Sequence, residues 1–292
     1  MTTERANKAH HRPDAPIGPD EQTLHYGPDP KGHRGRGPFF RLLGTPGGNL
    51  IPVVGILALW QLGSMTTLID PTFFPAPTDC VRALVQLSGD GELLPNLLIT
   101  LQRIILGFAL GVFPAIIVGI AMARLPWVRV IVDPLIAITY PIPVIAILPL
   151  LLVIFGTGGR PIIVLAGIIS FFPAAVNSLT GVLRVDERLV LMARNLGGSR
   201  RQILWKVVLP GALPSIFAGI RLAAGLSLLG TIAGEFLAAS DGIGSMTWKY
   251  WQIYQITNMY ATLAVIAAMG FLLTTVTLRV QRRYFSWTEN AS

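Results

Sequence analysis

The chain has 292 residues, of which 52% are hydrophobic and only 13% are charged. A soluble domain usually carries about 25% charged residues, so half that fraction with a mean hydropathy of +0.60 indicates an integral membrane protein. This composition argues against a soluble enzyme, a secreted domain and a disordered regulator. The net charge of +8 suits nucleic acid or anionic lipid as a partner, and the position of the charges decides between them.

The first 49 residues differ in composition from the rest of the chain. They hold all four histidines, seven of the 22 prolines and eight of the 30 glycines. Such a composition is typical of a disordered tail. It does not match a signal peptide, because no apolar segment appears before about residue 50 and both signs of charge occur over residues 4–21.

From residue 50 onward the chain consists largely of apolar runs. A membrane-spanning helix needs about 20 largely apolar residues, and six segments meet that requirement. The expected fold is therefore all-α, a six-helix membrane bundle over residues 50–285 with a short C-terminal tail at 286–292. The six expected spans are 50–69, 95–123, 130–155, 161–182, 210–234 and 259–278.

Lysines and arginines are unequally distributed between alternate sides of these spans. One side holds three of them, whereas the other side holds fourteen, at 34–49, 124–129, 183–209 and 279–283. By the positive-inside rule, both termini and the loop at 183–209 are cytoplasmic. Topology thus explains the basic excess, which favours membrane lipid as the partner and argues against nucleic acid.

The loop at 70–94 lies on the outer side in this topology. Asp79 is expected to cap a short interfacial helix that runs to about Leu87. Leu84 and Leu87 would share one face of that helix.

Ionisable residues within the spans are costly and are therefore functional candidates. Arg103 in the second span and Glu235 at the outer end of the fifth lie at comparable depth, so we expect a structural ion pair between them. The alternative for Arg103 is a position that faces an anionic substrate. Arg221, near mid-depth in the fifth span, either ties helices together or supplies positive potential to a pathway for anions. Asp133 lies somewhat further in on the third span.

Three prolines, Pro141, Pro143 and Pro149, are expected to break or kink the third span. Freed backbone carbonyls at depth are tolerated where they are buried in protein or line a wet cavity. The third span is therefore the favoured candidate for lining a pathway, with a kink needed only for packing as the alternative. In the fourth span, Asn177 and Ser178 are expected to hydrogen-bond between helices rather than to line the pathway.

The inner loop at 186–209 is too long and too regular for a simple turn. Asp186 precedes an apolar-rich stretch, a Gly-Gly pair follows it, and Ser199 with a glutamine three residues on forms a capping-box pattern. The glycines supply the backbone freedom needed between two short helices, and the second helix is expected to end at Leu209-Pro210. From the residues alone, the first helix is either an amphipathic helix at the membrane surface or a helix that docks on a partner.

The spacing in this loop resembles the coupling loop of permease subunits of bacterial ATP-binding-cassette importers. Ala193-Arg-Asn-Leu-Gly197 is followed after nine residues by Val207-Val-Leu209-Pro210, and the family pattern is Glu-Ala-Ala, three residues, Gly, nine residues, Ile, any residue, Leu-Pro. Leu191 and Met192 stand where the family usually has Glu and Ala. Further motifs similar to the nitrate, sulfonate and taurine branch are Phe74-Pro75-Ala-Pro77, Thr100-Leu-Gln-Arg103, Pro141-Ile-Pro143, Phe155-Gly156-Thr-Gly158, Gly219-Ile-Arg221 and Glu235-Phe followed by Gly242-Ile-Gly244.

The resemblance implies a permease in the bacterial cytoplasmic membrane whose loop docks on a separate cytoplasmic ATPase dimer. That dimer would carry ATP and Mg, and a soluble extracytoplasmic binding protein would deliver the substrate. Six spans are too few to enclose a pathway, so a second permease subunit, most simply a second copy, is expected. The residues that the resemblance implies in coupling are Ala193, Gly197, Gly198, Arg200, Leu209 and Pro210.

The sequence argues against catalysis by this chain. It contains no Gly-x-x-x-x-Gly-Lys motif and no clustered metal ligands, so we expect neither a cofactor nor an enzyme activity in it. An intramembrane serine enzyme is disfavoured because every histidine lies in the tail and no lysine lies in a span. An ion-coupled secondary transporter is a further alternative, although such proteins often carry more intramembrane acids than Asp133 and Glu235.

The substrate that this branch implies is a small anion such as an alkanesulfonate, taurine or nitrate. Related importers carry a pyrimidine precursor, bicarbonate or an aromatic acid. No residue of the sequence separates these options.

Overall fold

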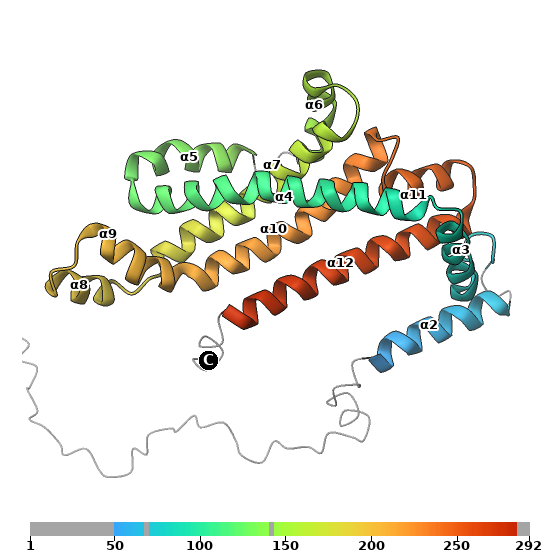
Figure 1. The fold of residues 1–292 in the computed structure, drawn as a ribbon, viewed down its shortest axis with the longest axis horizontal. Helices are drawn as coiled ribbons and strands as arrows, with labels where there is room; N and C mark the ends of the chain where they lie inside the picture. Colours follow the sequence, from blue (N-terminus) through green and yellow to red (C-terminus); the bar gives the residue numbers. More distant parts are fainter. Residues whose placement is uncertain (1–49, 67–69, 140–142, 285–292) are drawn as a thin grey trace, which may run out of the picture. The chain divides into compact units, whose positions relative to one another are not determined.

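The computed structural model describes residues 50–66, 70–139 and 143–284, and every regular element in these ranges is a helix (Figure 1). The expectation of an all-α chain is therefore confirmed for the described residues. The chain divides into two units, Met1–Gly55 and Ile56–Ser292, and apart from the first residues of α2 the helices below belong to the second. The tails expected over 1–49 and 286–292 lie outside the described residues.

Four helices in the described ranges are long and apolar enough to cross a membrane. Each of them contains the whole of one expected span, at 95–123, 161–182, 210–234 or 259–278. The four helices are α4 (Leu93–Arg124), α7 (Gly159–Leu183), α10 (Leu209–Ala238) and α12 (Ile256–Tyr284).

The first expected span, at 50–69, contains a shorter helix. Helix α2 (Leu50–Met65) has 16 residues, which is fewer than the roughly 20 that a spanning helix needs. Residues 67–69 lie outside the described ranges. The structure therefore describes an apolar helix in this segment that is too short to count as a fifth span by length alone.

The break expected in the third span, at 130–155, is confirmed. The segment is divided into α5 (Pro126–Thr139), a 3₁₀ turn η1 (Val144–Ile147) and α6 (Leu148–Phe155). The prolines explain the division, because proline lacks the N–H that would continue a helix. Pro143 precedes η1, and Pro149 lies in the first turn of α6, where the missing N–H costs nothing. Pro141 lies outside the described residues.

Helix α3 (Pro77–Gly89) occupies the loop at 70–94, where a short helix was expected. The expectation that Asp79 caps it is wrong, because Ala76 is the N-cap residue and makes no side-chain cap. Asp79 instead lies in the first turn and pairs with Arg82 at 2.8 Å. Leu84 and Leu87 do share a face, and both join the apolar cluster that contacts α12.

Small residues bring α4 and α7 into close contact. A Cβ atom added at Gly107 would lie 2.6 Å from the Cβ of Ala166, and one added at Gly111 would overlap the carbonyl oxygen of Gly167. Helices inside a membrane gain little from the hydrophobic effect, so close van der Waals packing of small residues holds them together. These glycines therefore set the distance between the two backbones.

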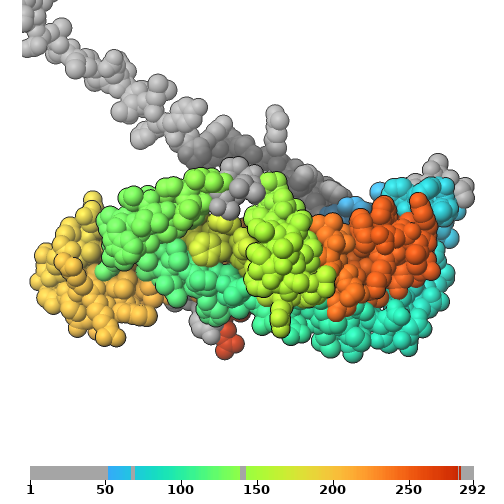
Figure 2. All heavy atoms as spheres, turned by 90° about the horizontal axis from the view of Figure 1, so that it is seen from above, coloured from blue at the N-terminus to red at the C-terminus, as the bar shows by residue number. Residues whose placement is uncertain are grey.

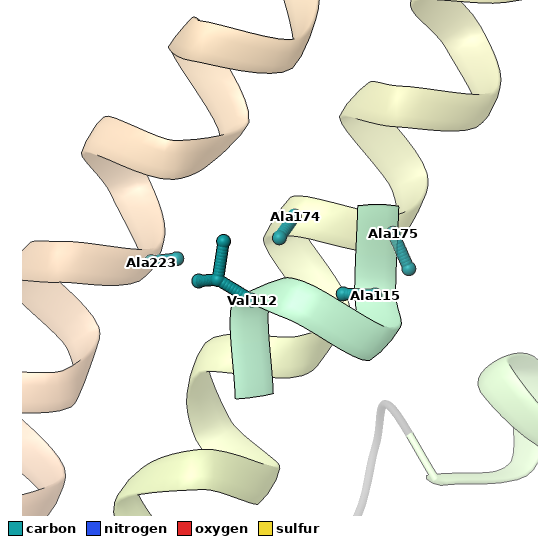
Figure 3. Packing of buried hydrophobic residues seen from close by; sticks show 5 residues of the cluster. All are labelled: Val112, Ala115, Ala174, Ala175 and Ala223. Carbon is teal, nitrogen blue, oxygen red and sulfur yellow. The ribbon is translucent and has the colours of Figure 1, made fainter. Parts of the chain in front are cut away.

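A cluster of small side chains lies where α4, α7 and α10 meet (Figure 3). It consists of Val112 and Ala115 of α4, Ala174 and Ala175 of α7, and Ala223 of α10, all of them buried. Because four of the five are alanines, the three helices approach closely along this line. This trio forms the centre of the bundle.

Helix α12 packs at one end of the bundle, against α3 and α11 (Ile243–Gln252). Its buried Ala261 contacts the α3 cluster, and its Val265 packs with Ile243 and Met246 of α11. Figure 2 shows α5 (green) and α6 (yellow-green) on one face, between the segment 187–208 (yellow-orange) at one end and α11 (orange) at the other. Helix α10 therefore connects two opposite ends of the bundle, and each end carries a distinctive set of side chains.

We expect Gly111→Ala to lower the free energy of unfolding by about 1–3 kcal/mol, the usual effect of forcing an extra methyl group into a close contact. Thermal unfolding in mild detergent measures this effect. The matched control is Gly225→Ala on α10, where an added Cβ would meet nothing within 4 Å. Equal loss of stability in both variants would contradict the packing of α4 on α7 described above.

Candidate functional site

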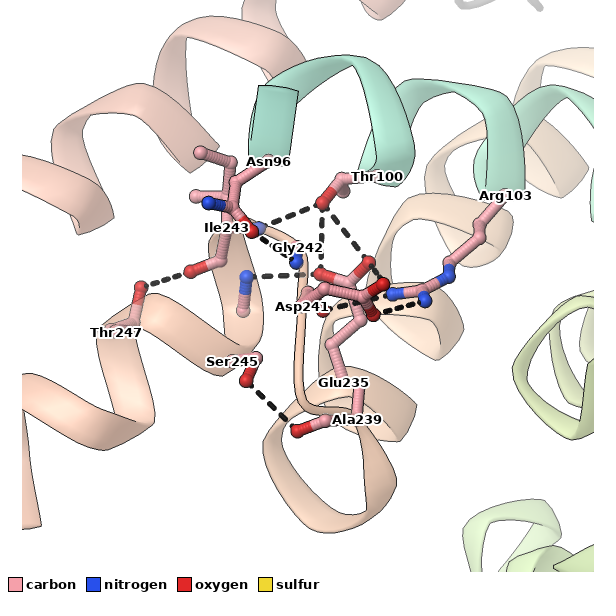
Figure 4. Close-up of polar contacts among 11 residues, drawn as sticks. Asn96, Thr100, Arg103, Glu235, Ala239, Asp241, Gly242, Ile243, Ser245 and Thr247 are labelled. Atoms are coloured by element: carbon pink, nitrogen blue, oxygen red, sulfur yellow. Dashed lines mark hydrogen bonds and ion pairs between the residues drawn. The ribbon is translucent and has the colours of Figure 1, made fainter. Parts of the chain in front are cut away.

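A buried ion pair joins α4 to α10 at the end of the bundle that carries α11 (Figure 4). The guanidinium of Arg103 lies 2.8 Å from the carboxylate of Glu235, and the side chains are 6% and 0% exposed. Arg103 also donates to the main-chain oxygen and the carboxylate of Asp241, which follows α10. The ion pair expected between Arg103 and Glu235 is therefore present.

The Glu235 carboxylate is fully surrounded by hydrogen-bond donors. The Thr100 hydroxyl lies 2.9 Å from it, and the backbone N–H of Gly244 donates to it at 2.9 Å. The Thr100 oxygen in turn accepts from the N–H of Ile243 at 2.8 Å. A buried carboxylate is tolerated only when its oxygens are satisfied in this way.

The α10–α11 turn is built around this carboxylate. Gly242 has a φ of +98°, a left-handed conformation that favours glycine. A Cβ added there would overlap the Glu235 carboxylate. The N–H of Gly242 donates to the Asn96 side chain at 2.6 Å, so the turn is tied to α4 as well as to α10.

Three residues of this network were not expected from the sequence, namely Asn96, Thr100 and Asp241. Asn96, Thr100 and Arg103 are spaced i, i+4 and i+7, which places them on one face of α4. That spacing was the available signal. No such signal marked Asp241, because it lies outside the expected spans and approaches Arg103 only through the α10–α11 turn.

The network leaves Arg103 no free direction toward a substrate. Its donors are directed at Glu235 and Asp241, and its side chain is almost fully buried. The geometry thus fits the structural role expected for this arginine and not the substrate-facing alternative. What the network does is hold α4, α10 and the start of α11 together.

The other polar residues expected in the spans behave differently. Asp133 pairs with Arg129 one turn away on α5, at 3.2 Å, and both side chains are about half exposed. Asn177 and Ser178 were expected to bond between helices, which is wrong. They donate to the carbonyls of Pro173 and Ala174 in their own helix, because the carbonyl one turn back is the nearest acceptor in an apolar environment. Arg221 is exposed on α10, with no hydrogen bond or ion pair to another described residue.

At the opposite end of α10 the chain forms the expected helix, glycine turn and helix. Helix α8 (Glu187–Asn195) begins after Asp186, whose carboxylate accepts from the N–H of Arg188 at 2.9 Å. Gly197 has a φ of +79°, and the N–H of Gly198 donates to the carbonyl of Ala193 at 3.0 Å. The turn therefore needs glycine at 197 for its backbone conformation.

The second short helix has the predicted capping box but not the predicted end. Helix α9 (Arg200–Ile203) starts with reciprocal bonds between Ser199 and Gln202. It then runs through a π-helical segment, η2 (Leu204–Val208), directly into α10, so the expected stop at Leu209-Pro210 is wrong. The N–H of Leu209 bonds five residues back to Leu204. This wider turn admits Pro210, whose ring would otherwise clash with the preceding helical turn.

Helix α8 presents apolar side chains to solvent. Leu191 and Met192 of the helix are exposed, and Leu196, the residue that follows it, is 88% exposed. Val190 and Ala193 point the other way and pack against the cluster that contains Ile203. The loop is thus a folded unit with its own small core and an unpaired apolar surface, flanked by Arg194, Arg200 and Arg201.

A groove of about 640 Å³ between α4, α10 and α12 is lined almost entirely by aliphatic and aromatic side chains. Thr277 is the one polar residue in that lining, and no charged residue contributes to it. Such a groove suits an apolar chain and offers an anion no partner.

Comparison with known proteins gives a consistent set of relatives. A family model described as "Binding-protein-dependent transport system inner membrane component" matches residues 115–288. The chain is 37% identical over 237 residues to "Taurine transport system permease protein TauC" of Escherichia coli (strain K12), which covers 80% of this chain and 86% of that protein. It is 32% identical over 243 residues to "Putative aliphatic sulfonates transport permease protein SsuC" of Bacillus subtilis (strain 168), covering 83% and 88%. Its fold is similar to a chain of the MetNI methionine ABC transporter solved in inward-facing conformations, with a TM-score of 0.59 and 22% identity, over 67% of this chain and 97% of that one.

We expect Glu235→Gln to destabilise the chain by about 3–5 kcal/mol, because it removes the fully buried counter-charge of the Arg103 guanidinium and leaves only the half-exposed carboxylate of Asp241 beside it. Thermal unfolding in detergent measures the loss. Asp133→Asn is the matched control, since it breaks an exposed ion pair that contributes about 1 kcal/mol or less. A loss for Glu235→Gln no larger than that of the control would show that the pair does not hold α4 and α10 together.

Proposed function

The chain belongs to the family of binding-protein-dependent transport system inner membrane components, and from this premise we propose that it serves an ATP-driven importer of small organosulfonates such as taurine. Membership makes it the membrane-embedded permease subunit of an ABC importer. The observation that carries the choice of substrate is the 37% identity over most of the chain to a taurine permease, beside 32% to an aliphatic sulfonate permease.

In the proposed topology six segments span the membrane, within a permease domain over residues 50–285. Helix α2 belongs to the first span, and α5, η1 and α6 belong to the broken third span. The excess of lysine and arginine at one end supports a cytoplasmic position for the loop 186–209 and for both termini. The Arg103–Glu235 network then lies at the outer end, where a soluble binding protein delivers substrate.

The loop 186–209 is proposed as the coupling site for a separate ATPase. Its support is the exposed apolar surface of α8, because Leu191, Met192 and Leu196 have nothing to cover them within the described chain. Arginines flank that surface, so the complementary groove would be apolar with an acidic rim. ATP and Mg would bind to the ATPase dimer and not to this chain.

Helix α10 provides a direct mechanical link between the two ends. Helical structure is continuous from Arg200 to Ala238, 39 residues, which corresponds to roughly 58 Å at 1.5 Å per residue. A displacement of the loop by the ATPase would therefore move α10 as a unit and act on the outer network. In this proposal the bundle has two states, and ATP binding to the ATPase shifts the equilibrium between them through contacts at the loop. Two copies of the chain would enclose the path between them.

We expect Leu196→Ser to weaken co-purification of the ATPase by about tenfold or more, the loss typical of removing an apolar anchor at an interface. Because Leu196 is 88% exposed, the variant should unfold at the wild-type temperature. Val85→Ser on α3 is the matched control, since Val85 is also a well-exposed aliphatic residue but lies far from the loop in sequence. Equal ATPase recovery from Leu196→Ser and wild type would contradict docking at α8.

The substrate is tested with the permease, its ATPase and its binding protein reconstituted together in vesicles. We expect ATP-dependent uptake of taurine and ethanesulfonate, with nitrate and bicarbonate failing to compete at similar concentrations. Uptake driven by an ion gradient without ATP would revive the secondary transporter. ATP-dependent uptake of nitrate or bicarbonate in preference to sulfonates would overturn the substrate proposed here.

A further inference from the structure

Arg221 is unusual among the charged residues of the four long helices. Within the described chain it is the one that lies away from a helix end and has no carboxylate or hydrogen-bond partner, whereas Arg103 and Glu235 neutralise each other. It lies 12 residues after the start of α10 at Leu209, which is roughly 18 Å along the helix axis. That distance is more than half the thickness of a hydrocarbon core of about 30 Å.

An arginine at this depth does not face lipid. Insertion of an arginine at the centre of a spanning helix costs about 2.5–3.5 kcal/mol at the least, and its side chain is too short to reach either surface from mid-depth. The side chain is nevertheless exposed in this chain. The face of α10 that carries Arg221 must therefore meet water or a polar partner in the assembled protein.

Neither carboxylate of the expected spans, Glu235 or Asp133, is available to neutralise it. Glu235 is engaged by Arg103 and Thr100, and Asp133 is engaged by Arg129. The charge of Arg221 therefore remains uncompensated in the described chain. A positive charge in that situation attracts anions from the nearest water.

Gly225 lies one turn beyond Arg221 on the same face. Every other glycine of α4, α7, α10 and α12 has a neighbour that an added Cβ would touch, and most are explained by close helix packing. At Gly225 an added Cβ would meet nothing within 4 Å. Glycine in a helix interior costs roughly 0.5–1 kcal/mol relative to alanine, so packing inside this chain gives no reason for it. Its effect is to leave open space beside the guanidinium.

One further turn along, Leu229 is also exposed. The face thus presents a cation, a gap and an aliphatic side chain at i, i+4 and i+8, which are neighbours on a helix surface. An alkanesulfonate has the matching pattern, since it carries an anionic head with three acceptor oxygens and an apolar tail. The planar fork of an arginine donates two parallel hydrogen bonds to oxyanions of this kind.

We propose that Arg221 binds the sulfonate group of the substrate in a water-filled path along α10, and that the alkyl tail lies over Gly225 toward Leu229. This assignment rests on the proposed function, because it takes the sulfonate from the substrate class argued above. It adds the residue that contacts the anion and the residue that limits the length of the tail. A second copy of the chain would supply the opposite wall of the path.

Thiol labelling in the reconstituted complex tests the assignment without relying on transport. Cys80 is the sole cysteine, and burial raises the pKa of its thiol, so it reacts slowly with thiol reagents. A Cys80→Ala background removes its remaining reaction. In that background we compare Gly225→Cys with Phe271→Cys, an exposed position on α12. The two positions lie at similar depth, because a Cβ added at Gly270, next to Phe271, would lie 3.2 Å from the side chain of Leu228 on α10. The probes are sulfonatoethyl and trimethylammonioethyl methanethiosulfonate, which differ in the sign of their charge.

We expect Gly225→Cys to react with the sulfonate probe roughly tenfold faster than with the cationic probe, because the charge of Arg221 lies one turn away. The added change Arg221→Gln should abolish that preference, and Phe271→Cys should react with neither probe. Labelling of Gly225→Cys as slow as that of Phe271→Cys, or without an anion preference, would overturn the assignment. The labelling result stands even where an Arg221 variant assembles poorly, because the first comparison keeps Arg221.

Uptake separates this proposal from the one on which it rests. No ethanesulfonate uptake by the wild-type complex would overturn the proposed function, and the sulfonate assignment with it. With wild-type uptake present, we expect Arg221→Gln to lose it about tenfold or more and Gly225→Leu to exclude butanesulfonate more strongly than methanesulfonate. Wild-type rates in Arg221→Gln, or equal effects of Gly225→Leu on both sulfonates, would overturn the site while leaving the importer function intact.

Discussion

The buried ion pair between Arg103 and Glu235 organises the end of the bundle at which α4, α10 and α11 meet. A charge removed from water must be matched by an opposite charge and by hydrogen bonds, or the fold does not tolerate it. That requirement explains the hydroxyl of Thr100, the backbone donor of Gly244 and the tight turn at Gly242. Each of them satisfies an oxygen of Glu235 or makes room for it, so the turn is shaped by the carboxylate that it encloses.

The other end of α10 satisfies its polar groups in a different way. There the loop helices α8 and α9 form a small core of their own, and the capping box and the glycine turn satisfy their backbone groups. Apolar side chains remain uncovered on α8, which is the opposite of the fully matched network. A rigid, satisfied end and an end with an open apolar surface, joined by one continuous helix, suit a subunit that receives motion at one end and transmits it to the other.

Between the two ends, small residues control how the helices pack. The glycines of α4 bring its backbone against α7, and alanines fill the line at which both meet α10. Asn177 and Ser178 bond to carbonyls of their own helix, whereas Ser227 of α10 donates to the carbonyl of Ile104 on α4 and so adds a polar tie between these helices. Against this background Arg221 and Gly225 stand apart, because no packing or polar contact in the described part of the chain accounts for either residue. Because the described chain does not cover this face of α10, we expect a substrate path and a second copy of the chain to meet it there.

The sequence by itself determined the membrane class, the positions of the four long helices, the helix–glycine–helix loop and the pairing of Arg103 with Glu235. These follow from local composition and spacing, and from the rule that two opposite charges at one depth in an apolar medium combine. The prolines of the third span likewise predicted its break. Only the tertiary structure decided that α9 continues into α10 through a π-helical segment and that Asp241, Thr100 and Asn96 complete the network. Each of these features depends on which hydrogen-bonding group lies within about 3 Å of another. Hydropathy and motif spacing do not give that distance, least of all for the network residues, which are more than a hundred positions apart.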